Sequence, residues 1–246
     1  MIQNDKLLVG VVAFNEMHRI APVIEKLLKN QKTNGYGIVF GDDGSTDGTG
    51  EFLKSIADKE GFGYIRHEKN SGVGTMIRDI IQYGKNNGYS VLTLMSANGK
   101  TDPEDLKTMY IPVLAEEYDY VKGSRFMKGG SRENMPLFRT LSIPVFSLFV
   151  SVLMGRWVSD VTCLINASNL KIYDDPDINL YQDWLDTYGL EYYILFYVLK
   201  KKYRMKEVPV TIHYPADHKN YSKIKPGSGW WQMIRPWFLL RTGIKK

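Results

Sequence analysis

Two adjacent carboxylates, Asp42 and Asp43, are the side chains of this sequence best placed to do chemistry. They follow a short apolar run and open the sequence Asp-Asp-Gly-Ser-Thr-Asp-Gly-Thr at residues 42–49, which leads into an amphipathic segment. This order is typical of a buried strand, a tight turn and the start of a helix. We expect Ser45 or Thr46 to cap that helix, and Asp47 to lie where the helix dipole favours an anion.

Carboxylates at the end of a strand suit ligands that donate hydrogen bonds or carry positive charge. In an open α/β sheet, ligands bind outside the carboxyl ends of the strands, which is where Asp42 and Asp43 are expected. They could accept from the N–H edge of a uracil or guanine base or from ribose hydroxyls, or hold a cation that accompanies a diphosphate. The alternative is a helix cap beside a surface acid, because so short a motif also occurs without a function.

The elements that must position these acids alternate along the chain. Apolar runs predict strands at residues 7–13, 36–41, 64–67, 90–95, 118–124 and 206–212. Helices are predicted at residues 19–30, 46–60, 74–86 and 180–201, with another that starts at residues 102–104. This alternation predicts an α/β fold with a doubly wound, mostly parallel sheet and helices on both faces.

Composition limits the classes of function that the chain can serve. With 246 residues, 43% hydrophobic and 24% charged, it can form one large core. The net charge of +5 suits an anionic ligand or a membrane surface, but is too small to indicate nucleic acid binding. A single cysteine, Cys163, excludes an internal disulfide framework and fits a reducing compartment. The first six residues show no signal-peptide pattern, so we expect a cytoplasmic protein.

Two apolar segments in the second half suggest contact with a membrane. Residues 140–155 carry no charge, but the run is shorter than the roughly 20 residues of a membrane span and contains Pro144. It fits either a core helix or a helix lying in a membrane interface. The tail at residues 230–246 mixes tryptophan with arginine and lysine, which is typical of an interfacial amphipathic helix. The alternative is a helix that merely covers the core.

Several motifs occur together in a fixed order: Val-Ala-Phe-Asn-Glu at residues 12–16, the Asp-Asp stretch at 42–49, Asn-Ser-Gly-Val-Gly at 70–74, Asp-Pro-Glu-Asp-Leu at 102–106, and Gly-Ser-Arg at 123–125. This set resembles the family 2 glycosyltransferases with the GT-A fold. The branch it most resembles contains dolichyl-phosphate mannose synthase and other polyprenyl-phosphate sugar transferases. The resemblance runs from about residue 7 to residue 212. It implies a GT-A domain at residues 1–215, followed by a mobile basic loop and an amphipathic C-terminal helix at residues 216–246.

The resemblance also implies a nucleotide pocket. Its residues would be Ala13, Phe14, Asn15, Glu16, Asp42, Asp43, Asn70, Gly72 and Ser96. Within this set, Ala13, Phe14, Glu16 and Asp42 would bind the base and ribose, with Asp43 nearer the diphosphate. The glycines at residues 70–74 would permit close backbone approach and positive φ angles, although a simple helix-start turn would also use them.

The chain departs from the family after the fourth predicted strand. Where these enzymes usually carry Asp-x-Asp, it reads Ser-Ala-Asn-Gly-Lys at residues 96–100. Asn98 offers a neutral oxygen, a poor substitute for a carboxylate toward Mg²⁺ or Mn²⁺, so we predict no certain metal site and only weakened metal binding. Lys100 could take over part of the cation's role on the leaving diphosphate. The alternatives are a solvated turn lysine or an inactive site, the latter disfavoured because the nucleotide-binding pattern is intact.

On the acceptor side, the resemblance pairs Arg125 with Arg139 as ligands of a lipid phosphate, because planar guanidinium groups match phosphate geometry. Ser222 and Lys223 would lie in a loop that closes over the diphosphate. Glu191 is the best-placed candidate base, and we include it with Asn98 and Lys100 as a candidate catalytic residue. A phosphate monoester with a second pKa of about 6 needs little deprotonation, which favours a lipid-phosphate acceptor over a sugar hydroxyl.

The leading hypothesis is an inverting glycosyltransferase that moves a sugar from a UDP- or GDP-sugar to a polyprenyl phosphate. We expect it to be peripheral on the inner face of the membrane. One alternative is transfer to a sugar hydroxyl during surface-polysaccharide assembly. Another is a non-catalytic nucleotide-sugar-binding protein. Partners would be the nucleotide-sugar donor, a polyprenyl-phosphate or glycan acceptor and the membrane surface, without nucleic acid.

Overall fold

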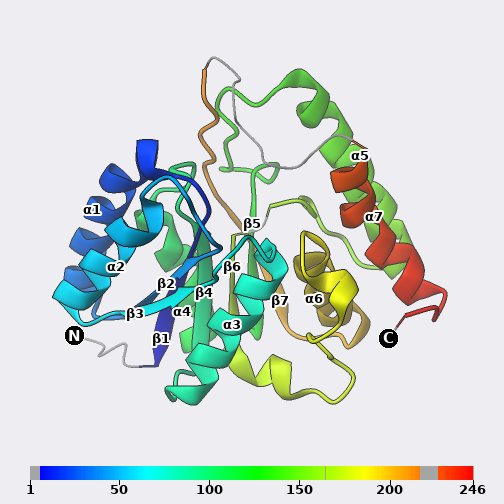
Figure 1. Cartoon of the computed structure of the whole chain (residues 1–246). Helices are drawn as coiled ribbons and strands as arrows, with labels where there is room; N and C mark the ends of the chain where they lie inside the picture. The colour runs from blue at the N-terminus through cyan, green and yellow to red at the C-terminus, as the bar shows by residue number, and fades with distance from the viewer. Residues whose placement is uncertain (1–5, 164, 217–226, 246) are drawn as a thin grey trace.

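A seven-stranded sheet lies at the centre of the chain (Figure 1). The computed structural model describes residues 6–163, 165–216 and 227–245. The strands are β1 (Leu7–Ala13), β2 (Gly37–Asp42), β3 (Gly63–Arg66), β4 (Val91–Ser96), β5 (Tyr120–Ser124), β6 (Asn166–Asn169) and β7 (Met205–Pro209). Their order across the sheet is β3-β2-β1-β4-β6-β5-β7. The predicted α/β class and mostly parallel sheet are confirmed.

The register of the parallel strands brings the predicted site residues to one edge of the sheet. Ala13 at the end of β1 pairs with Asp42 at the end of β2, and Val12 pairs with Ser96 at the end of β4. β6 was not predicted and runs antiparallel to both β4 and β5. Its sequence, Asn-Ala-Ser-Asn, has little of the apolar or β-branched character that marks a strand.

Seven helices are formed by the described residues. They are α1 (Met17–Asn34), α2 (Thr49–Glu60), α3 (Val73–Asn86), α4 (Leu106–Leu114), α5 (Leu137–Met154), α6 (Gly189–Lys200) and α7 (Ser228–Arg241), with short 3-10 turns η1 (Pro103–Asp105), η2 (Leu170–Asp174) and η3 (Asp183–Leu185). Apolar side chains of α1, α2 and α4 form the core on one face of the sheet, and those of α3 and α6 form the core on the other. β1 serves both, since Leu7 and Leu8 point to opposite faces as the period of a strand requires.

The start of α2 differs from the prediction. Neither Ser45 nor Thr46 caps it, because the helix begins at Thr49, after Gly48 in a left-handed conformation with φ of 94°. Asp47 accepts from the backbone N–H of Thr49 at 3.1 Å, so it does lie at the helix start. Ser45 and Thr46 instead form hydrogen bonds with Asn15 in the loop that follows β1.

Helices α5 and α7 lie side by side at one edge of the molecule (Figure 1). Phe138 of α5 stacks on Trp230 of α7 with ring centroids 5.3 Å apart, and Phe149 lies 5.7 Å from Phe238. On its inner side α7 buries Trp237 completely against α6. Helix α7 therefore covers part of the core, which was one of the two predicted alternatives. Its outer side is apolar and exposed.

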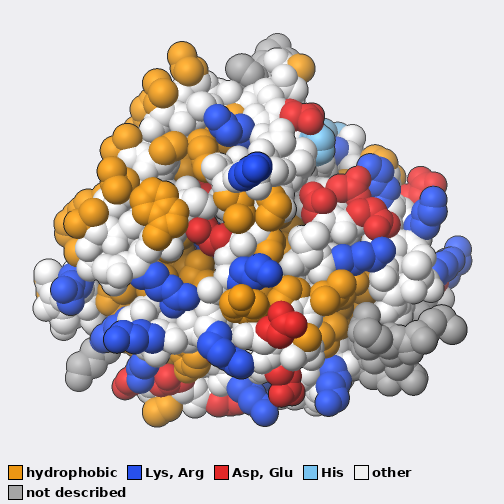
Figure 2. Space-filling model, turned by 180° about the vertical axis from the view of Figure 1, so that it is seen from behind, with side chains coloured by type: hydrophobic (Ala, Val, Ile, Leu, Met, Phe, Trp, Pro, Cys, Tyr) orange, Lys and Arg blue, Asp and Glu red, His pale blue; other side chains and the backbone are white. Residues whose placement is uncertain are grey.

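The exposed apolar surface of α5 and α7 is continuous, and Figure 2 shows hydrophobic side chains gathered along this edge, at the left of the view. We call it the apolar face. Its exposed residues are Leu137, Phe138, Leu141, Val145, Leu148, Phe149, Val152, Trp230, Trp231 and Phe238. By length and composition alone, α5 could cross a membrane. Its packing beside α7 and its buried inner side, which includes Ile143 and Val150, describe a helix that lies on the protein.

Candidate active site

A cavity of about 870 Å³ opens at the carboxyl ends of β1 and β4. It contains most of the predicted site residues, which come from widely separated parts of the chain: Ala13, Phe14, Glu16, Asp43, Asn70, Gly72, Ser96, Asn98, Lys100, Arg125, Arg139 and Glu191. The first two turns of α7 close one side through Ser228, Gly229, Gln232 and Met233. Ser222 and Lys223 lie outside the described residues.

The loop after β1 is fixed by the segment that follows β2. Ser45 Oγ accepts from the backbone N–H of Asn15 at 2.9 Å, and Asn15 Oδ1 accepts from the backbone N–H of Thr46 at 2.9 Å. Thr49 Oγ1 accepts from the backbone N–H of Glu16 at 2.9 Å. The small polar residues thus position the neighbouring loop, and the Asn15 side chain is engaged in that contact. Phe14 and Glu16 on either side of it line the cavity.

The two adjacent acids have different surroundings. Asp42 is fully buried, accepts from the backbone N–H of Ser45 at 3.1 Å and lies 3.5 Å from Arg66 Nε. Asp43 lines the cavity. Asp42 is therefore not among the lining residues of the cavity, whereas Asp43 is, and the contact of Asp42 with the base stays a prediction.

Asp43 also holds the second loop of the cavity. Its Oδ1 accepts from the backbone N–H of Ser71 at 2.9 Å, and its Oδ2 accepts from that of Gly72 at 3.0 Å. Gly72 has φ of 101°, as predicted for this loop. The backbone of Gly72 packs closely against that of Asp186, because a Cβ at residue 72 would lie 2.3 Å from the carbonyl oxygen of Asp186. In the structure the glycine therefore allows a close contact within the protein.

His67, which sequence reasoning missed, completes this arrangement. Its Nδ1 lies 2.7 Å from Asp43 Oδ1 and its Nε2 lies 2.9 Å from Asp79 Oδ2. Burial lowers the pKa of the ring, but the hydrogen bonds to Asp79 and Asp43 outweigh it, so the pKa of His67 is raised above its usual 6.5. The sequence feature that could have identified His67 is its position directly after β3, at the same edge of the sheet as Asp43.

At the opposite end of the cavity, Arg125 is committed to protein partners. Its Nε and Nη2 donate to the two oxygens of Asp160 at 2.7 and 2.8 Å. Nη2 also donates to Thr162 Oγ1 at 2.6 Å, and Nη1 donates to Tyr214 Oη at 2.5 Å. The Arg125 cation holds the pKa of Asp160 below its usual value despite burial. Most of the guanidinium is therefore used to fix the cavity wall.

Lys100 and Arg139 share the ring of Tyr214, which sequence reasoning did not single out. Lys100 Nζ lies 5.5 Å and Arg139 Cζ 5.9 Å from the ring centroid. Burial, and next the nearby Arg139 cation, lower the pKa of Lys100 to about 8. Tyr214 thus joins three cationic side chains, because its hydroxyl also receives the hydrogen bond from Arg125. This end of the cavity suits anions.

Glu191 enters the cavity from α6. Its Oε2 is buried and has no hydrogen-bond partner within the described part of the chain. Burial raises the pKa of Glu191 to about 8, although the Lys122 ammonium opposes the shift. At neutral pH the side chain is therefore mainly protonated, and it adds little negative charge to the anion-binding end.

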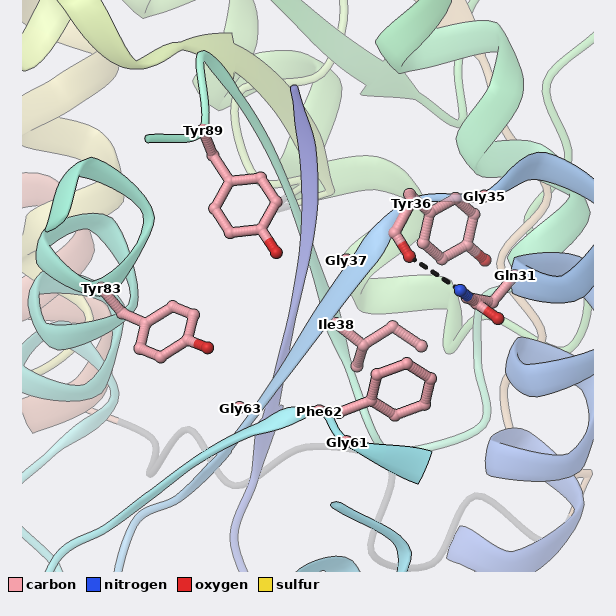
Figure 3. A pocket seen from close by; sticks show the side chains of 10 residues that line it. All are labelled: Gln31, Gly35, Tyr36, Gly37, Ile38, Gly61, Phe62, Gly63, Tyr83 and Tyr89. Atoms are coloured by element: carbon pink, nitrogen blue, oxygen red, sulfur yellow. Dashed lines mark hydrogen bonds between the residues drawn. The ribbon is translucent and has the colours of Figure 1, made fainter. Parts of the chain in front are cut away.

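A smaller hollow of about 340 Å³ lies at the other edge of the sheet, where β2 and β3 begin (Figure 3). Its lining consists of Gln31, Gly35, Tyr36, Gly37, Ile38, Gly61, Phe62, Gly63, Tyr83 and Tyr89. Tyr89 and Tyr83 reach over Gly37 and Gly63, where a Cβ would lie 2.2 and 2.5 Å from their hydroxyls. This hollow has no charged side chain among its described lining residues, so the chemistry belongs to the larger cavity.

The sequence profile described as Glycosyl transferase family 2 matches residues 8–163, which carry the loops after β1, β2 and β4 and the Arg125–Asp160 pair. The chain belongs to this family. The glycosyltransferase is 34% identical over 218 residues to an uncharacterised protein of Methanocaldococcus jannaschii, a match that covers 87% of this chain and 84% of the relative.

Other comparisons agree with the family and with the fold. The polyprenol monophosphomannose synthase of Mycolicibacterium smegmatis is 24% identical to the glycosyltransferase over 208 residues, 84% of this chain and 77% of the relative. The crystal structure of glucosyl-3-phosphoglycerate synthase from Mycobacterium tuberculosis superposes with a TM-score of 0.68 at 17% identity, covering 98% of this chain and 81% of that one. The likeness shows a GT-A-like fold.

Proposed function

We propose that this glycosyltransferase moves a sugar from a UDP- or GDP-sugar to a polyprenyl phosphate at a membrane surface, with inversion at the anomeric carbon. One observation carries the proposal: the anion-binding end of the cavity meets the first turns of α5 and α7, whose outer sides form the apolar face. An acceptor with a phosphate head and a long apolar chain needs both features next to one another.

The apolar face fits an interface better than it fits water. Leu141, Val152 and Trp231 are 63%, 76% and 56% exposed. A contiguous apolar surface of this kind on a soluble domain indicates a protein or membrane contact. Tryptophan and the basic residues Arg241 and Lys245 near the end of α7 favour a lipid surface carrying anionic head groups. We therefore propose peripheral attachment to the inner face of the membrane.

The donor would occupy the other end of the cavity. Ala13 at the end of β1, Phe14 and Glu16 on the loop after it, and Asp43 directly after β2 line this part of the cavity. An aromatic ring beside carboxylates suits a base and the hydroxyls of a ribose. The diphosphate would then extend toward Lys100 and the acceptor toward Arg139, which places both phosphorus-containing groups at the cationic end.

The step needs only one bond made and one broken at the anomeric carbon. An oxygen of the acceptor phosphate attacks this carbon while the bond to the donor diphosphate breaks, and the electron pair leaves with the nucleoside diphosphate. A phosphate dianion carries no proton to remove, so the reaction proceeds without a general base. Glu191, mainly protonated at neutral pH, is compatible with a phosphate acceptor and is poorly prepared to deprotonate a sugar hydroxyl.

The Mycolicibacterium relative is named a polyprenol monophosphomannose synthase, and this product class supports a polyprenyl-phosphate acceptor. The test is sugar transfer from labelled UDP- and GDP-sugars to polyprenyl phosphate in anionic liposomes, with a soluble oligosaccharide as the competing acceptor. We expect labelled lipid with one donor class. Transfer to the oligosaccharide alone would refute the proposed acceptor and support hydroxyl glycosylation.

A further inference from the structure

We infer that in this glycosyltransferase Lys100, rather than a divalent cation, neutralises the diphosphate of the donor. The inference rests on the proposed function and deepens it. Relatives of this fold are expected to hold a metal through Asp-x-Asp after the fourth strand, whereas the corresponding residues here, at 96–100, include a serine, an asparagine and a lysine. The structure allows the fit of a metal to be judged from the donor groups around that position.

The turn after β4 offers a poor set of ligands. Asn98 Oδ1 accepts from the backbone N–H of Lys100 at 3.1 Å, so the one oxygen that replaces a carboxylate is already used to close the turn. The next acid, Asp102, accepts from the backbone N–H of Glu104 and forms an ion pair with Lys26 at 3.0 Å. Hard cations such as Mg²⁺ and Mn²⁺ prefer ionised carboxylates, which this turn does not direct into the cavity.

The carboxylates that line the cavity elsewhere are also engaged. Glu16 forms an ion pair with Arg19 at 3.2 Å, and Asp43 accepts from two backbone N–H groups in addition to its contact with His67. Glu191 is mainly protonated at neutral pH. No cluster of three or more metal-ligating side chains occurs among the described residues. The donor groups present therefore do not fit a divalent cation.

Lys100 lies where it can replace the positive charge of a metal ion in the cavity. Its backbone carbonyl accepts from the N–H of His213 at 3.0 Å, which ties the turn after β4 to the segment after β7. Its ammonium lies over Tyr214 in the cavity wall, close to Arg139. The backbone N–H of Lys100 is thus held by the Asn98 side chain, its carbonyl by the backbone of His213 and its ammonium by the ring, so its charge is preorganised at the cavity surface.

A fixed ammonium group can do the electrostatic part of a metal's task. When the bond to the anomeric carbon breaks, negative charge accumulates on the leaving diphosphate, and a cation already in place stabilises that charge without reorganisation. Because this charge grows toward the transition state, the lysine contributes more to turnover than to donor binding. Arg139 would serve the acceptor phosphate, which gives each anion its own cation.

The experiment measures binding of UDP and GDP by titration calorimetry, with EDTA in one arm and Mg²⁺ or Mn²⁺ in the other. Wild type is compared with Lys100→Met, which keeps the length of the side chain without its charge, and with Lys54→Met on the exposed side of α2. Thermal unfolding checks that each variant is folded. Sugar transfer by the same proteins is measured in both arms.

We expect wild type to bind one nucleoside diphosphate with equal affinity in EDTA and in metal. Lys100→Met should weaken binding about 10-fold or more and lower turnover further, in both arms, while Lys54→Met matches wild type. Binding by wild type that disappears in EDTA would overturn the inference and leave the proposed function standing. Failure of wild type to bind either nucleoside diphosphate in either arm would overturn both.

Discussion

Nδ1 of His67 lies 2.7 Å from Oδ1 of Asp43, the carboxylate that also holds the backbone of residues 71 and 72. The histidine therefore orients the acid on which one wall of the larger cavity depends. Its other nitrogen contacts Asp79, so both ring N–H groups of a protonated His67 have an acceptor. The protonation of His67 is consequently linked to the position of the loop that Asp43 holds.

The first prediction concerns pH. A pKa raised above 6.5 in the folded protein means that the contribution of His67 is complete below about pH 6.5 and is lost as the pH rises through the folded-state pKa. Stability and nucleoside diphosphate affinity should both decline over that interval. His67→Gln should flatten both profiles, measured by thermal unfolding and calorimetry.

Asp79→Asn is the matched control for that experiment. It leaves the contact between His67 and Asp43 in place but removes the second carboxylate, so the decline should move to lower pH without disappearing. Identical profiles in wild type and both variants would show that His67 has no influence on the cavity.

The second prediction separates the two adjacent acids. Asp43→Ala should weaken nucleoside diphosphate binding by about 1.5–3 kcal/mol, the usual value of hydrogen bonds to a charged group, because the loop of residues 70–72 loses its anchor. Asp42→Ala should instead lower the melting temperature, since Asp42 is fully buried beneath the start of α2. Calorimetry and thermal unfolding of both variants check this. A larger affinity loss for Asp42→Ala would contradict this division and support the predicted contact of Asp42 with the base.

Sequence reasoning predicted the sheet and most of the cavity because parallel strands end at a common edge, so residues at strand ends become neighbours. It did not predict which distant residues a side chain contacts in the folded protein. Ser45 had the signature of a helix cap, yet it bonds Asn15, and the two residues are 30 positions apart in the chain. For Arg125 a contact with phosphate stays a prediction, but its pairing with Asp160, 35 positions away in the chain, was not predicted. Spacing alone carries no information on such contacts.

The third prediction concerns the Arg125–Asp160 pair. Removing one member of a buried ion pair leaves an uncompensated charge, so Asp160→Ala should destabilise the protein by about 3–5 kcal/mol. Arg139→Ala, at the start of α5, should leave the melting temperature nearly unchanged and raise the KM for polyprenyl phosphate. Denaturant unfolding and steady-state kinetics distinguish the two effects. Equal losses of stability in both variants would contradict this division of roles.

The fourth prediction concerns the apolar face. Leu141→Asp should reduce co-sedimentation with anionic liposomes, because a charge replaces apolar surface that enters the lipid interface. Ile111→Asp is the matched control, since Ile111 is 54% exposed but lies on α4, away from α5 and α7. Wild-type binding should also fall with salt. Equal liposome binding by wild type and Leu141→Asp would remove the membrane from the proposal.

The last prediction uses the pH dependence of transfer to identify the acceptor. Lys100 and Glu191 both have a pKa of about 8, but in opposite senses, because burial lowers the pKa of the ammonium and raises that of the carboxyl. Below pH 8 the pair is a cation and a neutral acid, which attracts phosphates. Above it the pair becomes a neutral amine and an anion, which repels them. The other charged groups around Lys100 are Arg139, Glu16, Arg19 and Arg125.

Transfer to polyprenyl phosphate should therefore decline above about pH 8, and Glu191→Gln should stay active at neutral pH while losing part of that decline. A hydroxyl acceptor demands the reverse, since ionised Glu191 would have to act as the base. The rate would then rise through pH 8, and Glu191→Gln would be inactive at every pH. Measuring kcat/KM for both proteins from about pH 6 to about pH 9.5 decides between these outcomes, because a neutral amide can replace a protonated carboxyl but cannot accept a proton from a hydroxyl.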